Sequence, residues 1–165
     1  MASLEMTNAA PDLRGLHNGE WQQVTPGERV RTLVSAAQTM GRFSVVEMIA
    51  DPGNGVPMHV HDNEDEHFIV LEGAFHMAVG TKLQDLVAGD SLTVARGVAH
   101  AWCNASSAPA HVLGVFSPAG LEEFFREIAG LADAAEITAI ANRYGTRIVG
   151  PPLDETAYTI SAPRR

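Results

Sequence analysis

The feature that most limits the fold is a long series of short apolar or alternating runs, each ended by turn-forming residues. Between Trp21 and about Phe116 these runs cover residues 30–34, 43–49, 67–71, 75–79, 83–87, 91–94 and 111–116. The breaks between them contain glycine, proline, asparagine or aspartate, as in residues 26–27, 51–55, 72–73 and 88–90. Strands this short, repeated at this spacing, predict an all-β fold in the form of an antiparallel sandwich or barrel.

The pattern becomes helical after Phe116. Ser117-Pro118 can begin a helix, and one apolar face follows at helical spacing with Leu121, Phe124, Phe125 and Ile128. Asp133, with Glu136 three residues later, resembles the start of a second helix. Its apolar face would hold Ile137, Ile140, Ala141 and Tyr144, and Gly145 stands where a helix-ending glycine is expected. Two C-terminal helices are therefore predicted, covering an open end or an edge strand of the barrel.

The length of 165 residues suits one domain with its own core. We expect a lead-in over residues 1–20, a β-barrel over 21–117, and a helical extension and tail over 118–165. The N-terminus lacks the basic start and apolar segment of a secretory signal, and no apolar run is long enough to span a membrane. A cytoplasmic protein is the resulting expectation.

The composition excludes several kinds of site and partner. A net charge of −9 disfavours nucleic acid and anionic membrane surfaces as partners. Cys103 is the single cysteine, so an intrachain disulfide and a multi-cysteine metal site are excluded. Small molecules remain the expected partners, and a homodimer is the expected assembly.

The chemistry is concentrated in residues 53–73. His59 and His61 are two residues apart, so on a strand both imidazoles point to the same face. The acidic residues 62–65 are expected to form a solvated turn. Glu66 then begins the next strand, and a hairpin at this turn would bring its carboxylate back beside the two histidines.

A second segment, residues 89–104, supplies a further histidine. Gly89-Asp90 and Arg96-Gly97 suggest turns on either side of a strand, and His100 follows them. Trp102 and Asn104 share the face of His100 by alternation, whereas Cys103 faces the opposite way and is expected to be inert core.

These two segments resemble the two conserved motifs of the cupin superfamily. The first, G(X)5HXH(X)3–4E(X)6G, is matched by Gly53, His59, His61, Glu66 and Gly73. The second, G(X)5PXG(X)2H(X)3N, is matched by Gly89, Gly97, His100 and Asn104. Ala95 replaces the proline of the second motif, which removes no metal ligand. The tail, with residues 142–145 and 150–152, is also similar to bacterial cupins related to quercetin 2,3-dioxygenase.

The resemblance implies a cupin barrel, also called a double-stranded β-helix or jelly roll, that binds one divalent metal ion. The ligands would be His59, His61, Glu66 and His100, and Glu66 would also be the catalytic base. Such a mixed nitrogen and oxygen set suits Fe, Mn, Ni, Cu or Zn. Three histidines and one carboxylate leave coordination positions open for a substrate. His67, His76 and His111 are expected to be ordinary strand histidines.

Three functions are compatible with such a site. The first is a dioxygenase, similar to quercetinases, acting on a small enolic or phenolic substrate with Glu66 accepting its proton. The second is a non-catalytic small-molecule-binding protein whose metal anchors an anionic ligand. The third is a metal-dependent isomerase or epimerase, which would need no dioxygen. The sequence does not specify the substrate, because one fold hosts many functions.

Overall fold

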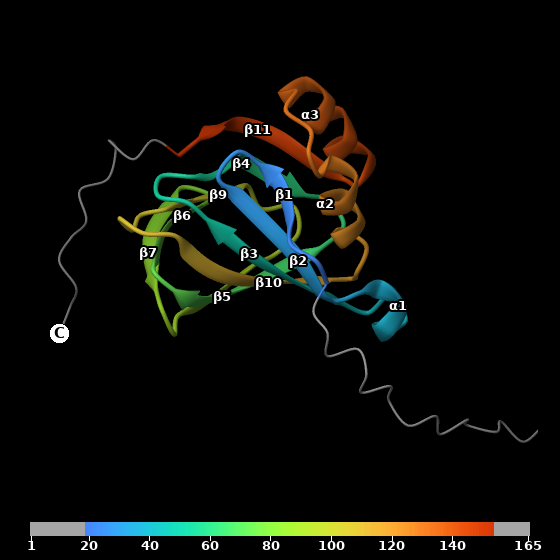
Figure 1. Ribbon diagram of the computed structural model, residues 1–165, viewed down its shortest axis with the longest axis horizontal. Helices are drawn as coiled ribbons and strands as arrows, with labels where there is room; N and C mark the ends of the chain where they lie inside the picture. Colours follow the sequence, from blue (N-terminus) through green and yellow to red (C-terminus); the bar gives the residue numbers. More distant parts are fainter. Residues whose placement is uncertain (1–18, 154–165) are drawn as a thin grey trace, which may run out of the picture.

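Two antiparallel sheets make up most of the protein, whose computed structural model describes residues 19–153. The first sheet has six strands in the spatial order β1 (Gln22–Thr25), β2 (Glu28–Val34), β3 (Ser44–Ala50), β10 (Ala110–Ser117), β5 (Asp65–Glu72) and β8 (Ser91–Val94). The second has the order β11 (Thr146–Pro152), β4 (Gly55–His61), β9 (His100–Asn104), β6 (Ala74–Val79) and β7 (Lys82–Val87). The predicted antiparallel jelly-roll barrel is confirmed (Figure 1).

The core fills the space between the sheets because inward positions alternate along each strand. On β10, for example, every second residue from Ala110 to Phe116 is buried. Phe68 and Val70 of the first sheet join Phe75, Met77 and Trp102 of the second in one cluster. The rings of Phe75 and Trp102 meet edge to face at 5.4 Å, a favourable aromatic geometry.

Three helices accompany the barrel, namely α1 (Ala36–Thr39), α2 (Glu122–Ile128) and α3 (Ala134–Arg143). Figure 1 shows α2 and α3 together beside β11, on one side of the barrel. The α3 prediction is confirmed in detail: the Asp133 side chain accepts hydrogen bonds from the backbone of Ala135 and Glu136, and Gly145 ends the helix at φ +77°. No helix within residues 19–153 is long and apolar enough to cross a membrane.

The expected start of the first C-terminal helix at Ser117-Pro118 is wrong. Ser117 still belongs to β10, where it pairs with Asp65 of β5, and α2 begins only at Glu122. The buried Glu122 carboxylate accepts hydrogen bonds from the backbone N–H groups of Ala36 and Gly120, at 2.6 and 2.8 Å. Ser117 therefore pairs in the sheet and does not start the helix. The Glu122 carboxylate fixes the start of α2 to the start of α1.

One strand, β11, is absent from the sequence predictions. The segment Thr146–Pro152 contains two prolines, which argue against a central strand because proline has no N–H to donate. It lies at the edge of the second sheet, where proline is tolerated, and pairs with β4 so that Thr146 stands opposite His61 and Ile148 opposite His59. The C-terminal extension thus contributes a strand beside the candidate site.

Candidate metal centre

The strand β4 carries two histidines whose side chains point inward. His59 pairs with His100 of β9, so three imidazoles come from adjacent strands of one sheet. At the start of β4 the backbone approaches β9 very closely: a Cβ on Gly55 would lie 2.1 Å from the carbonyl oxygen of Trp102. Gly55 therefore permits the close strand contact that sets the position of the two histidine-bearing strands.

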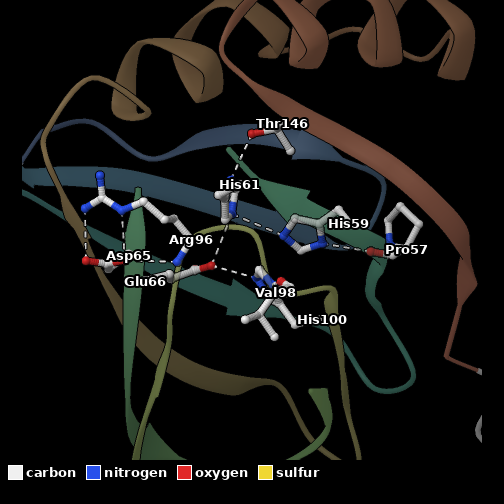
Figure 2. A network of polar contacts seen from close by, with 9 residues as sticks. All are labelled: Pro57, His59, His61, Asp65, Glu66, Arg96, Val98, His100 and Thr146. Atoms are coloured by element: carbon white, nitrogen blue, oxygen red, sulfur yellow. Dashed lines mark hydrogen bonds and ion pairs between the residues drawn. The ribbon is translucent and has the colours of Figure 1, made fainter. Parts of the chain in front are cut away.

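The carboxylate comes from the opposite sheet. Glu66 lies near the start of β5, where it pairs with Phe116 of β10 and Val94 of β8. The preceding residue, Asp65, accepts hydrogen bonds from the Arg96 backbone and guanidinium at 2.9–3.1 Å. This ion pair joins the start of β5 to the turn before His100, as Figure 2 shows.

The ligand atoms of His59, His61, Glu66 and His100 all lie within 4.8 Å of one another, and all four residues are buried. His61 Nε2 is 3.2 Å from both His59 Nε2 and Glu66 Oε2, and His100 Nε2 is 3.0 Å from the same carboxylate oxygen. Atoms at right angles around an ion at about 2.1 Å are about 3 Å apart, so these separations fit neighbouring ligands of one ion. The structure brings the four predicted residues together (Figure 2).

The other ring nitrogen of each histidine has an acceptor of its own. His59 Nδ1 lies 2.8 Å from the Pro57 carbonyl oxygen, and His100 Nδ1 lies 3.0 Å from that of Val98. His61 Nδ1 lies 2.9 Å from Thr146 Oγ1. These contacts place a proton on Nδ1 of each ring, so each Nε2 faces the centre of the cluster. There Nε2 donates to Glu66 when the ring is charged, or offers its lone pair to a cation when the ring is neutral. Two such lone pairs at 3.2 Å repel each other unless a cation lies between them.

The protonation states also suit a cation. Burial alone would raise the pKa of Glu66, but hydrogen bonds from His100 and His61 outweigh it and lower that pKa to about 2. Burial, together with the nearby charges of His100 and His61, lowers the pKa of His59 to about 3. Burial opposes a charge on His100, yet Glu66 raises its pKa overall. At neutral pH the carboxylate is ionised and His59 is neutral, as ligation requires.

The donor set therefore fits one divalent metal ion. Three neutral imidazole nitrogens and one carboxylate oxygen are ligands that Fe, Mn, Ni, Cu and Zn all accept, and the geometry does not choose among them. Four protein ligands on one side leave further positions open on a five- or six-coordinate ion.

A cavity of about 480 Å³ extends from the cluster toward the C-terminal helices. His59, His61 and Glu66 line it at the metal end, together with Phe116 and Thr146. Most of its remaining wall is apolar and comes from both the barrel and the extension, with Val24, Met48, Val56, Trp102, Leu121, Phe124, Phe125, Ile128 and Ile137. Trp102 and Phe116 lie in this wall, whereas Phe68, Val70 and Met77 belong to the core.

Residues 46–116, which include both motif segments, match the cupin domain family. Residues 46–116 therefore form a cupin domain. Ala95 replaces the proline of the second motif, but the turn that follows it is intact. Gly97, at φ +78°, donates its N–H to the His61 carbonyl oxygen at 2.8 Å. Asn104, the last residue of the motif, is structural, because its Nδ2 donates to the carbonyl oxygens of Ala50 and Ala108 at 2.8 Å.

Curated relatives align with only part of the chain. A 76-residue segment is 30% identical to mannose-1-phosphate guanylyltransferase 2 of Escherichia coli O157:H7, covering 46% of this chain and 16% of that protein. An 88-residue segment is 26% identical to quercetin 2,3-dioxygenase of Bacillus subtilis (strain 168), covering 53% of this chain and 26% of that protein. The chain thus spans about a quarter or less of the length of either relative.

Solved structures agree on the fold. KdgF from Halomonas sp. superposes with a TM-score of 0.58 at 22% identity, covering 63% of this chain and 90% of that one. An RmlC-like cupin from Shewanella frigidimarina NCIMB 400 gives a TM-score of 0.55 at 24% identity, covering 64% and 88% of the two chains. Both likenesses show the fold alone.

The acidic segment after β4 is only partly the solvated turn that was expected. Asp62 pairs with Arg147 at 2.8 Å and Asp65 with Arg96, and both carboxylates are at the surface. The expectation of a solvated turn is wrong for Glu64, which is buried. Its Oε2 has no hydrogen-bond partner among the described residues, and burial raises its pKa. Ion pairs on either side hold the turn so that Glu64 points inward.

Within residues 19–153, the remaining histidines and the cysteine lie outside the cluster, as expected. His67 Nδ1 is 2.7 Å from Thr93 Oγ1, and His76 Nδ1 is 2.6 Å from an Asp85 carboxylate oxygen. His111 Nε2 lies 2.6 Å from a Glu47 carboxylate oxygen. Cys103 is buried in the core.

The sequence predictions miss polar residues of the site, of which Thr146 and Glu28 matter most for its chemistry. Thr146 reaches His61 from β11, a strand that the sequence pattern does not reveal. Glu28 lines the cavity from β2. Its alternation with the buried Val30 places it on the inward face, and this signal was available in the sequence.

Proposed function

We propose that this cupin is a metal-dependent dioxygenase acting on a small, largely apolar enol or phenol. The observation that carries the proposal is the joining of a His3Glu cluster to an apolar cavity of about 480 Å³. A volume of this size accommodates a drug-sized molecule. The partial match to quercetin 2,3-dioxygenase of Bacillus subtilis supports the same chemistry.

The cavity wall favours an aromatic substrate over a sugar. Phe116, Phe124, Phe125 and Trp102 offer ring faces and edges. Away from the metal cluster, few polar side chains line the wall, so most hydroxyl groups of a buried sugar would lose their hydrogen bonds. Each such loss costs about 1–3 kcal/mol. This argues against the isomerase alternative for carbohydrate substrates.

The chain's own residues would bind and deprotonate the substrate. A bound redox-active divalent metal would supply a Lewis acid for the enol oxygen and a route for electrons between substrate and dioxygen. Glu66, ionised at neutral pH, would take the enol or phenol proton on its carboxylate. Phe124 and Phe125, from the helix that lies over the cavity, would limit the access of water to the reacting end. One O2 would be consumed per substrate, both atoms would enter the products, and no external reductant would be needed.

Oxygen uptake tests the proposal. Protein purified without oxygen is loaded separately with Fe(II), Mn(II), Ni(II), Cu(II) or Zn(II), and each form is mixed with 3-hydroxyflavone and a panel of other enols and phenols. The expected result is equimolar loss of O2 and substrate with at least one redox-active metal and none with zinc.

Two variants sharpen this measurement. Glu66→Gln should lower the rate by about a hundredfold or more, since general bases contribute factors of this size. Glu72→Gln, exposed at the end of the same strand, is the matched control and should keep full activity. Tight binding without O2 uptake would instead support a binding protein, and conversion without O2 would support an isomerase.

A further inference from the structure

The cavity contains a second carboxyl group that does not belong to the metal cluster. Glu28, the first residue of β2, lines the cavity and is only 3% exposed. Burying a carboxyl group in an apolar wall is costly unless the group has a partner or a use. Among the described residues, the hydrogen-bond partner of this carboxyl is the Thr25 hydroxyl, which also lines the cavity.

The contact with Thr25 leaves one carboxyl oxygen available. Thr25 Oγ1 donates to Glu28 Oε2 at 3.1 Å, and Oε1 has no partner there. Among residues 19–153 no charged side chain acts on the group, so burial raises the pKa of Glu28 to about 7, with the Thr25 hydrogen bond opposing the shift. Near neutral pH a large share of the molecules therefore carries Glu28 as the neutral acid, which can both donate and accept a hydrogen bond.

Strand register places Glu28 far from the metal end. Glu28 pairs with Ala50 of β3, whereas Phe116, the partner of Glu66, pairs with Ser44 of the same strand. Ala50, which is level with Glu28, and Ser44, which is level with Glu66, are six residues apart along β3. Six residues of strand span at most about 20 Å. A ligand that reaches both carboxyl groups must be elongated.

We propose that Glu28 is a second recognition point, at which its carboxylic acid pairs with a hydroxyl or carbonyl oxygen on the part of the substrate farthest from the metal. This rests on the proposed function, since it takes the enol or phenol end of the substrate to lie at His59, His61 and Glu66. The substrate class narrows accordingly to flat, mostly apolar molecules with an oxygen group at each end.

Two probes differing in one oxygen test this assignment. The equilibrium affinities of 3-hydroxyflavone and 3,4′-dihydroxyflavone are measured without oxygen, by fluorescence, on metal-loaded wild type, Glu28→Met and Glu28→Gln. Methionine matches the length of glutamate without a strong hydrogen-bonding group, and glutamine keeps a donor and an acceptor. Metal content and the midpoint of urea unfolding confirm that each variant is folded and loaded.

We expect the Glu28→Met substitution to lower the affinity for one probe and not for the other. Glu28→Met should lower the affinity for 3,4′-dihydroxyflavone by about tenfold, the effect of losing one buried hydrogen bond. The affinity for 3-hydroxyflavone should not change. Glu28→Gln should restore most of the affinity for the dihydroxy probe. If both probes bind all three proteins with the same ratio of affinities, the role of Glu28 is refuted while the proposed substrate class stands. If neither probe binds the loaded wild type, the proposed function fails and the assignment resting on it fails too.

Discussion

Thr146 Oγ1 lies 2.9 Å from His61 Nδ1, although 85 positions separate the two residues in the sequence. The contact is made because β11 pairs with β4 and sets Thr146 directly opposite His61 (Figure 2). Thr146 fixes the ring orientation of one candidate ligand, and the C-terminal extension thereby becomes part of the candidate metal site.

Removing this hydroxyl should weaken metal binding. Thr146→Val keeps the shape of the side chain and deletes the acceptor of His61 Nδ1, and loss of such partners typically lowers metal affinity by about 10–100-fold. Competition with a chelating dye measures the change. Thr138→Val is the matched control, because Thr138 also lines the cavity but donates to the backbone of its own helix. Equal affinities in wild type and Thr146→Val would show that Thr146 does not support the site.

The pKa of Glu28 should make stability depend on pH. Its folded value is about 7 against an ordinary value of 4.5, so between these pH values the unfolded chain releases a proton that the folded protein retains. The free energy of unfolding should therefore fall as pH rises from 4.5 to 7, by an amount on the order of 3 kcal/mol from this group. Below pH 4.5 this contribution is fully present.

Urea unfolding of metal-free protein at several pH values provides the measurement, and Glu28→Gln isolates the group. The variant has no proton to release at this position, so the difference in unfolding free energy between wild type and variant should decrease across the same window. Parallel curves for the two proteins would mean that Glu28 titrates normally.

The last residue of the second motif should matter for folding rather than for the metal. Asn104 is 1% exposed, and its side chain hydrogen-bonds to the backbone of Ala50 and to that of Ser106 and Ala108 in the turn after β9. Asn104→Ala should lower the free energy of unfolding by about 3 kcal/mol, because buried backbone groups lose their partners. Asn63→Ala, at an exposed site with one hydrogen bond, should cost about 1 kcal/mol or less. A similar small cost for both would contradict this role for Asn104.

Most of the barrel and the composition of the cluster follow from local sequence. Alternation along single strands predicts that His59 and His61 share a face, and the turn before Glu66 predicts its return toward them. The identity of the neighbouring strand is a property of the whole fold, which is why Thr146 was not predicted. The strand β11 was not predicted because it contains two prolines. Proline is found both in loops and in edge strands, and a single sequence does not distinguish the two.

Buried carboxyl groups were the hardest to foresee. Glu64 lies among acidic residues that read as a solvated turn, and its burial depends on the ion pairs of Asp62 and Asp65 with arginines far along the chain. Glu28 stands on the inward face of β2, but glutamate is so rarely buried that alternation alone did not single it out.

The central claim is that His59, His61, Glu66 and His100 hold one metal ion. The most direct test is elemental analysis of untagged protein purified at low oxygen, beside a His59→Ala/His100→Ala double variant. A His67→Ala/His111→Ala variant, altered outside the cluster, is the matched control. We predict about one equivalent of a divalent metal in wild type and control, and its loss from the first variant. Absence of metal from all three proteins, even after reconstitution, or equal metal in all three, would contradict the assignment.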